Sequence, residues 1–305
     1  MYSWMKNFPG GFAHGDYAYI VQGEKPYTTS DPGYICQISL ANFSVKECVK
    51  YQNKVWSDAW SAGGYGWTMG TTATYSFLNR FDLEPFGANT WFRLDNFLPG
   101  WVEWGTSFTD GANYGFLVKA AQVTRVTLSL FPSADAFDSW DVAPVEEGDK
   151  LRYGLVHGSF AYVVYDSGSL LRFEVEGFKT NGLTRLDPRP FGSAPANHIF
   201  TDATFLYMLP RSEGSSMVIT RIRLASFASS PPSVEAVAFD TGATGSLEWK
   251  GFHDGVHAYA VPDGYDASTT IQARILRFAV SAGAKCLNVP SDMAKMLKLS
   301  ECAAE

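Results

Sequence analysis

Residues Gly11–Val21 read GFAHGDYAYIV, and this stretch returns in altered form as GLVHGSFAYVV at Gly154–Val164 and as GFHDGVHAYAV at Gly251–Val261. Its central aromatic residue anchors a repeat that runs along the chain, with successive anchors 45 to 52 residues apart. The six anchors are Tyr19, Trp67, Phe116, Tyr162, Tyr207 and Tyr259. A period of this length indicates that the chain is built from copies of one structural unit.

Three further landmarks keep step with the anchors. The residue before the anchor is small in five copies: Ala18, Gly66, Gly115, Ala161 and Ala258, with Leu206 the exception. An alternating motif follows, starting at Gln37, Arg80, Arg125, Arg172, Arg221 and Arg277. Six residues after its start, five copies carry a phenylalanine: Phe43, Phe86, Phe131, Phe178 and Phe227. We expect each arginine to lay its stem over apolar surface and to pair with a carboxylate of the same or the adjacent unit.

The segments between these landmarks are short, rich in aromatic and β-branched residues, and separated by Gly, Asp, Ser and Pro, which is typical of strands. Each unit holds about four strands, and this combination of period and strand number predicts an all-β protein with the fold of a six-bladed β-propeller. The outer three strands of the blades are expected near 18–60, 66–104, 112–153, 158–196, 203–246 and 255–290.

One domain is predicted over 1–290, with 291–305 as a short helix or arm packed on the ring. A residual strand in MYSWMKNF is expected to complete the last sheet.

The alternation of side chains explains why the opening stretch recurs. Tyr17, Tyr19 and Val21 point to one face of the predicted second strand, and Ala18 and Ile20 point to the other. Both faces are apolar, so we expect a neighbouring sheet on each side. The small residue before the anchor would let that neighbouring sheet approach closely. The pairs His-Gly and Asp-Gly that precede the anchors predict tight turns, because glycine accepts positive φ.

In these features the chain resembles six-bladed β-propellers of the YWTD or NHL type. Their blades also carry an Asp/Gly turn before an aromatic strand and then an Arg-Ile/Phe-x-Leu/Val strand, which here includes Arg80-Phe81-Asp82-Leu83 and Arg221-Ile222-Arg223-Leu224. The resemblance covers nearly the whole chain. It implies the blade architecture but no activity, because the fold alone does not assign a function. Repeated Tyr-Trp-Thr-Asp runs, kelch double glycines and Trp-Asp blade endings are not found in the sequence.

Composition excludes several classes of protein. Of 305 residues, 46% are hydrophobic and 18% are charged, which suits a large packed core. The net charge of -7 argues against a nucleic-acid partner, and no apolar run is long enough to span a bilayer. The start of the chain lacks the plan of a signal peptide, so either such a segment was removed or the chain is intracellular; a secreted or organelle-lumen location is slightly favoured.

The four cysteines, Cys36, Cys48, Cys286 and Cys302, form no CxxC pair. Their even number permits two disulfides without requiring them, and the alternative is that each is a small buried hydrophobic residue.

The first candidate site is the set of turn positions before the anchors. Equivalent turns lie near one mouth of a propeller channel, where imidazoles and carboxylates could bind a divalent metal. Calcium is the first expectation and zinc a second, although no cofactor is the leading prediction. The alternative is that these residues form turns by bonding their own backbone. The metal candidates are His14, Asp110, His157, Asp202 and Asp254.

The second candidate site is the group of tryptophans in the connections between blades. Exposed tryptophans beside carboxylates would suit sugar stacking or a hot spot for a protein. The alternative is packing between adjacent blades. The binding candidates are Trp56, Trp60, Trp101, Trp104, Trp249 and Glu103, with Asp58 and Glu248 nearby.

A third candidate site comprises the polar connections after the second strands, QGEKPYTTSDPGY, GTTATYSFLN, PRSEGSSM and PDGYDASTT, which vary in length. The motifs GxSxG, HExxH, the P-loop and GxGxxG opening a helix are not found. The sequence therefore favours a non-enzymatic scaffold that binds a protein or a glycan, as a separate protein or as an accessory subunit. The alternative is a metal-dependent hydrolase or lyase, of lactonase or glycosidase type, with its site at the channel mouth.

Overall fold

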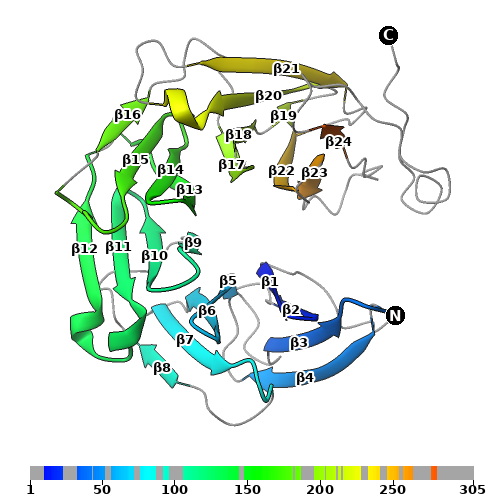
Figure 1. The fold of residues 1–305 in the computed structure, drawn as a ribbon, viewed down its shortest axis with the longest axis vertical. Coiled ribbons are helices and arrows are strands. Elements are labelled where there is room, and N and C mark those ends of the chain that lie inside the picture. Colours follow the sequence, from blue (N-terminus) through cyan, green and yellow to red (C-terminus); the bar gives the residue numbers. More distant parts are fainter. Residues whose placement is uncertain are drawn as a thin grey trace. The chain divides into compact units, whose positions relative to one another are not determined.

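The structure is a computed structural model. It describes residues 10–22, 33–42, 44–51, 56–71, 76–86, 92–95, 106–143, 148–180, 183–186, 196–202, 204–210, 212–213, 216–227, 233–240, 246–253, 257–263 and 276–279. The chain divides into two compact units, Met1–Ala143 and Pro144–Glu305, and each is described by itself. Both consist mainly of antiparallel strands (Figure 1). Within the described residues, no helix has the length and apolar character needed to cross a membrane.

The first unit holds three four-stranded sheets whose strands follow one another in chain order. The first sheet consists of β1 (Gly10–His14), β2 (Tyr17–Gln22), β3 (Gly33–Ser39) and β4 (Val45–Tyr51). The second consists of β5 (Trp56–Ala62), β6 (Tyr65–Thr71), β7 (Ser76–Asp82) and β8 (Phe92–Asp95). The third consists of β9 (Thr106–Thr109), β10 (Tyr114–Lys119), β11 (Gln122–Thr127) and β12 (Phe137–Asp141).

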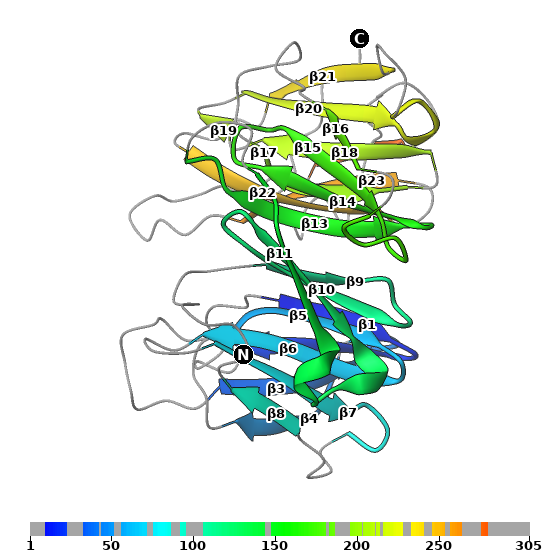
Figure 2. The same cartoon turned by 90° about the vertical axis from the view of Figure 1, so that its left-hand side faces the viewer.

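The second unit also holds three four-stranded sheets, and Figure 2 shows β13, β14 and β15 of the first of them side by side. The fourth sheet of the chain consists of β13 (Leu151–His157), β14 (Phe160–Tyr165), β15 (Leu170–Glu174) and β16 (Thr184–Leu186). The fifth consists of β17 (Ala196–Thr201), β18 (Phe205–Pro210), β20 (Ser216–Arg223) and β21 (Val234–Asp240). The sixth consists of β19 (Ser212–Glu213), β22 (Ser246–His253), β23 (His257–Asp263) and β24 (Leu276–Ala279).

The all-β prediction is confirmed. The sheets follow the predicted repeat, but the predicted ranges 18–60 and 112–153 extend into β5 and β13, the first strands of the following sheets. In each of the first five sheets, all four strands come from one copy of the sequence repeat, as predicted. The sixth differs, because β19 comes from the connection between β18 and β20 of the fifth sheet and pairs with the start of β22. The predicted strand in MYSWMKNF and the predicted tail at 291–305 lie outside the described residues. One closed ring, and one domain over 1–290, stay predictions.

Five of the six anchors are buried where the repeat predicts, in the second strand of their sheets, and Tyr259 is half-buried. Four of them stack on an aromatic residue of the first strand, with ring centroids 4.8–5.1 Å apart and ring planes within 16°. The stacked pairs are Phe12–Tyr19, Trp60–Trp67, Phe108–Phe116 and Phe200–Tyr207. Burying each large side chain contributes about 1.5–3 kcal/mol.

The recurring phenylalanine closes the contact between neighbouring sheets. Phe86 of the second sheet meets the edge of the anchor Tyr19 of the first sheet, with ring centroids 5.3 Å apart. The same T-shaped contact joins Trp67 to Phe131 at 5.1 Å and Tyr162 to Phe227 at 5.3 Å. The phenylalanine therefore keeps step with the anchor because it packs on the anchor of the preceding sheet.

The recurring arginine stacks on an aromatic ring two residues before the anchor. The guanidinium carbon lies 4.3–4.8 Å from the ring centroid in four sheets, in the pairs Arg80–Tyr65, Arg125–Tyr114, Arg172–Phe160 and Arg221–Phe205. The predicted carboxylate partner is confirmed twice, for Arg125 with Asp138 and for Arg221 with Glu235. Each guanidinium over a ring contributes on the order of 0.5–2 kcal/mol.

The small residue before the anchor allows close packing, as predicted. A Cβ atom on Gly115 of the third sheet would lie only 2.7 and 2.9 Å from two ring carbons of Trp60 in the second sheet. At Gly66 the space is instead filled by the Phe81 ring of the same sheet, 2.2 Å from such a Cβ. Phe81 in turn contacts Phe12 of the first sheet, with ring centroids 6.3 Å apart. In both cases the missing side chain makes room for an aromatic ring.

Candidate functional site

Each sheet has two ends that differ in their connections. At one end, here called the turn edge, the first strand turns back into the second, as His14 does opposite Tyr17. At the other end, here called the loop edge, the first strand begins and the second strand connects to the third. In the first sheet, the loop edge holds Gly10 opposite Val21 and the connection 23–32. Because neighbouring strands are antiparallel, the connections between successive sheets also arrive at the loop edge.

The turn edge carries the tight turns that the His-Gly and Asp-Gly pairs predict. Gly15, Gly111 and Gly158 follow His14, Asp110 and His157, and their φ values are 55°, 80° and 59°. In the second sheet the turn is Gly63-Gly64, with φ of 60° and 81°. A residue with a side chain would be strained in this left-handed region, so glycine is needed there. The pair Asp254-Gly255 lies outside the described residues.

The two described aspartates among the metal candidates bond their own turns. Asp110 Oδ1 accepts hydrogen bonds from the backbone N–H groups of residues 112, 113 and 114, each at 2.9 Å. Asp202 Oδ1 accepts from the N–H groups of Thr204 and Phe205, both at 2.6 Å. Asp202 Oδ2 accepts from the hydroxyl of the anchor Tyr207 at 2.7 Å. These carboxylates thus hold the turns, as the turn-forming alternative for these positions expects.

The two histidines among the metal candidates end first strands. His14 ends β1 and is half-buried. His157 ends β13, and its Nδ1 lies 3.5 Å from the Thr201 hydroxyl of the fifth sheet. Among the described residues, no group of three or more His, Cys, Asp and Glu side chains is arranged to hold a metal ion. Asp254, the fifth candidate, lies outside these residues, and the metal site stays a prediction.

Burial also affects the pKa of the anchor beside Asp202. Desolvation raises the pKa of the Tyr207 hydroxyl far above its ordinary value of 10, and the hydrogen bond and negative charge of Asp202 raise it further. Arg221 acts in the opposite direction on the pKa of Tyr207 but does not outweigh burial. The hydroxyl therefore stays protonated and donates to Asp202 over the physiological pH range, which suits a structural role.

Two of the candidate tryptophans are core residues, which corrects the expectation that they are exposed. Trp60 is 5% exposed and its Nε1 donates to the Ser107 hydroxyl of the neighbouring sheet at 3.0 Å. Trp249 is 1% exposed. Neither ring is open to a ligand.

The other binding candidates are placed only by topology. Trp56 begins β5, so its backbone lies at the loop edge of the second sheet; its side chain is not among the described groups. Trp101, Glu103 and Trp104 belong to the connection between β8 and β9, outside the described residues. That connection also arrives at a loop edge. The binding site at Trp56, Trp101 and Trp104 stays a prediction.

The structure reveals one set of equivalent positions that sequence reasoning missed. These positions lie two residues before the first-strand residue that faces the anchor, and we call them the bridging positions. They are Gly10, Asp58, Thr106, Tyr153, His198 and Lys250. In three sheets a register shift accompanies them, between Trp56 and Asp58, Leu151 and Tyr153, and Ala196 and His198. Such bulges redirect side chains at strand ends.

Three bridging residues contact the first strand of the next sheet through polar or aromatic groups. Asp58 Oδ2 accepts hydrogen bonds from the Thr106 hydroxyl at 3.0 Å and from the Ser107 N–H at 2.9 Å. The Tyr153 ring lies 4.9 Å from the imidazole of His198. His198 Nδ1 accepts from the Gly251 N–H at 3.3 Å, so in the neutral ring Nε2 carries the proton.

A close backbone contact replaces these groups at Gly10. A Cβ there would lie 2.9 Å from the Ala59 nitrogen of the second sheet. The bridging positions therefore join neighbouring first strands within each unit. Their chemistry changes from sheet to sheet, which hides them from a search for a recurring residue type. Their fixed spacing before the anchor's partner is the signal that could have found them.

The loop edge also carries the connections between second and third strands, and these differ strongly between sheets. Two are tight, 120–121 and 166–169, whereas 23–32 and 264–275 are long. In the fifth sheet the connection forms β19 and pairs with the sixth sheet. The turns between first and second strands are two to four residues long, whereas the connections between second and third strands range from two to twelve residues.

No family model matches the chain, and no curated protein matches it in sequence. The resemblance to YWTD or NHL blades therefore stays a prediction. Among solved structures, the chain is similar to the β-propeller domain of Cps50 (Swd1) from Myceliophteria thermophila, with a TM-score of 0.58 and 10% sequence identity. The match covers 91% of this chain and 87% of that domain. At this identity the similarity establishes the fold, and the chain has the fold of an all-β propeller.

Proposed function

We propose that this β-propeller is a non-enzymatic binding scaffold that recognises a protein partner with its loop edge. The observation that carries the proposal is the contrast between the two edges. The turns from first to second strands, at the turn edge, hold two to four residues, whereas the connections from second to third strands, at the loop edge, hold two to twelve. Loops that vary on a rigid scaffold are the usual place for recognition, because the scaffold holds them while their sequence changes.

The residue types of the loop edge support a protein partner. Trp56 begins β5 at this edge, Trp101 and Trp104 belong to the segment between β8 and β9, and tryptophan is enriched among the residues that dominate binding energy. The connections also come from several sheets. A protein interface needs roughly 800 Å² on each partner, so a surface fed by many loops suits it better than a single sugar-sized pocket does.

The polar groups described at the turn edge support the non-enzymatic part of the proposal. The carboxylates of Asp110 and Asp202 bond the backbone of their own turns. At the loop edge, Asp58 bonds the next sheet. These three carboxylates hydrogen-bond to other groups of the protein, whereas a catalytic carboxylate would face a substrate.

A matched pair of variants tests the proposal. The loop-edge variant combines Trp56→Ala, Trp101→Ala and Trp104→Ala. The turn-edge control combines Asp16→Ala with Asn113→Ala, at two exposed residues of the opposite edge. Tagged full-length proteins are incubated with extract of the cells that make the protein, and cross-linked partners are quantified by mass spectrometry.

We expect wild type and the control to retain the same protein partner. The loop-edge variant should retain it at least tenfold less, a loss of about 1.4 kcal/mol in binding free energy. Circular dichroism checks that all three remain folded. Equal retention by folded wild type, variant and control would refute the proposal. Binding of wild type to immobilised glycans, with the same loss in the loop-edge variant and no protein partner, would replace protein with glycan.

A further inference from the structure

The turn between β3 and β4 contains the sequence Asn42-Phe43-Ser44. Asn followed by any residue except proline and then by Ser or Thr is the acceptor sequence for N-linked glycosylation. The sequence alone is weak, because such triplets also occur by chance and are often buried. The structure supplies two independent observations that support the triplet at Asn42 as a glycosylation site.

The first observation is the geometry of the acceptor. Asn42 is exposed in the turn that joins the two strands. Its Oδ1 accepts a hydrogen bond from the Ser44 hydroxyl at 2.7 Å and a second from the Ser44 N–H at 3.1 Å. Both bonds use Oδ1, so neither occupies Nδ2, the atom that a glycan would modify. The hydroxyl that the acceptor sequence requires lies directly beside the carboxamide.

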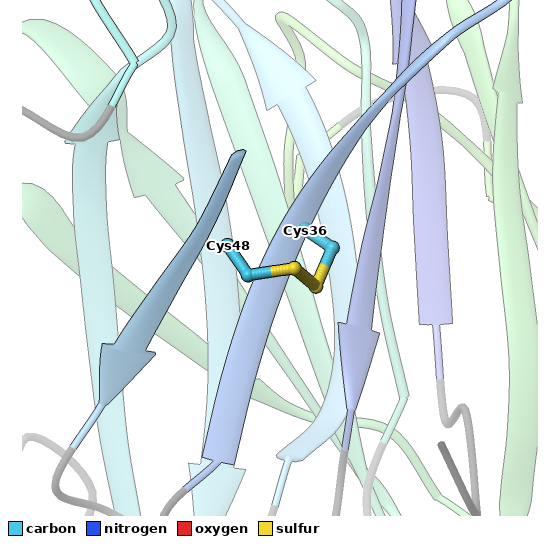
Figure 3. The surroundings of a disulfide bond; sticks show 2 residues. All are labelled: Cys36 and Cys48. Carbon is cyan, nitrogen blue, oxygen red and sulfur yellow. A yellow bond between two sulfur atoms is a disulfide. The ribbon is translucent and has the colours of Figure 1, made fainter. Parts of the chain in front are cut away.

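The second observation is a disulfide in the same hairpin. Cys36 on β3 and Cys48 on β4 are directly opposite each other and are bonded, as Figure 3 shows. Disulfides form and persist in oxidising compartments such as the lumen of the secretory pathway and are rare where glutathione keeps thiols reduced. The compartment that would form this bond is also the compartment in which N-linked glycans are added in eukaryotic cells.

We propose that Asn42 carries an N-linked oligosaccharide, added as the chain passes through the secretory lumen. In this reaction Nδ2 bonds to the anomeric carbon of the first sugar of a lipid-diphosphate-linked oligosaccharide. The bond from that carbon to the diphosphate breaks, the lipid diphosphate leaves with the electron pair, and Nδ2 loses one proton. The inference does not depend on the proposed binding function.

The position of the glycan has a consequence for the surface. The turn between β3 and β4 lies at the turn edge of the first sheet, because β3 runs parallel to β1 and β2 runs between them. A glycan is bulky and hydrated, so it keeps this end of the first sheet open to solvent. The loop edge, at the opposite end of the same strands, remains clear for a partner.

Peptide mapping tests the proposal on full-length protein isolated from the cells that make it. Digestion with trypsin without reduction gives a peptide that ends at Lys46 and holds Cys36 and Asn42. The disulfide links this peptide to residues Glu47–Lys50, which contain Cys48. One linked species therefore reports both modifications. We expect its mass to show a glycan that an amidase specific for N-linked glycans removes, leaving aspartate at position 42.

Three variants made in the same cells sharpen the test. Asn42→Gln and Ser44→Ala should each abolish the glycan, whereas Ser44→Thr should retain it because threonine also serves in the acceptor sequence. Asn42 is exposed and Ser44 is half-buried, and circular dichroism checks that each protein is folded. An unmodified Asn42 in wild type would overturn the proposal, whether or not the peptide is linked to Cys48. A glycan that persists in Asn42→Gln would also overturn it.

Discussion

At the scale of single residues, the repeat is maintained by contacts that need a particular size. Gly115 is small because the Trp60 ring of the second sheet occupies the place of its side chain. Trp60 is fixed there by stacking on Trp67 and by the hydrogen bond to Ser107. A buried ring held by both contacts cannot move away to admit an extra methyl group.

The change Gly115→Ala should therefore destabilise the protein by about 1–3 kcal/mol, the usual cost of overpacking a well-filled core. Urea unfolding measures the loss. The double variant with Trp60→Phe provides the control, since the smaller ring makes room for the methyl group. The two changes together should cost less than the sum of the single changes, whereas simple additivity would show that the ring does not clash.

Positions that keep the same residue type in each repeat could be predicted from the sequence. Positions that are structurally equivalent but change residue type could not. The anchors, the glycine at position 115 and the stacking arginines recur with their chemistry, so the sequence reveals them. The bridging positions keep their place while changing from Asp58 to Tyr153 to His198, because hydrogen bonds and ring stacking satisfy the same need for contact. The tryptophans show the opposite difficulty, since the residue type does not tell whether a tryptophan is buried in the core or exposed on the surface.

At the scale of elements, the hairpin of β3 and β4 carries its own covalent brace. The disulfide joins residues 12 apart in the sequence and links β3 to β4, the edge strand of the first sheet. The segment that it closes is short, and the bond restricts the unfolded chain by an amount that corresponds to roughly 3 kcal/mol.

Replacing both cysteines, with Cys36→Ala and Cys48→Ala, should lower the free energy of unfolding by about 2–4 kcal/mol. Denaturant unfolding of wild type in the presence and absence of a reductant is the matched control. The reductant should lower the stability of wild type toward that of the variant and leave the variant unchanged. If wild type is equally stable in both conditions, the bond either is absent or contributes nothing.

Strand boundaries were predictable to the extent that local pattern determines them. Alternation of side chains and turn glycines locate the strands of the first five sheets along the repeat, because each strand pairs with its neighbour in sequence. They do not fix where one sheet ends, since the predicted ranges 18–60 and 112–153 run into β5 and β13. The strand β19 escapes such reasoning. It is only two residues long and pairs with β22 of another unit of the repeat, so its pattern carries no signal of its own.

At the scale of the whole molecule, burial of the repeated aromatic residues makes folding sensitive to alkali. Burial raises the pKa of the hydroxyls of four tyrosines, Tyr19, Tyr162, Tyr165 and Tyr207. In the unfolded chain these hydroxyls ionise near pH 10. The folded chain keeps their protons to higher pH, so above pH 10 the unfolded state binds fewer protons and becomes favoured.

The free energy of unfolding should therefore be insensitive to these four groups below about pH 9 and should fall as the pH rises through 10 toward their folded-state pKa values. Each group contributes about 1.4 kcal/mol per pH unit in that range. Tyr207→Phe removes the hydroxyl with the most strongly raised pKa. It should start less stable at neutral pH, because the bond to Asp202 is lost, yet it should fall less steeply with alkali than wild type does. Urea unfolding followed by circular dichroism between about pH 9 and about pH 11.5 measures both slopes, and identical slopes would show that Tyr207 ionises as readily in the folded chain as in the unfolded one.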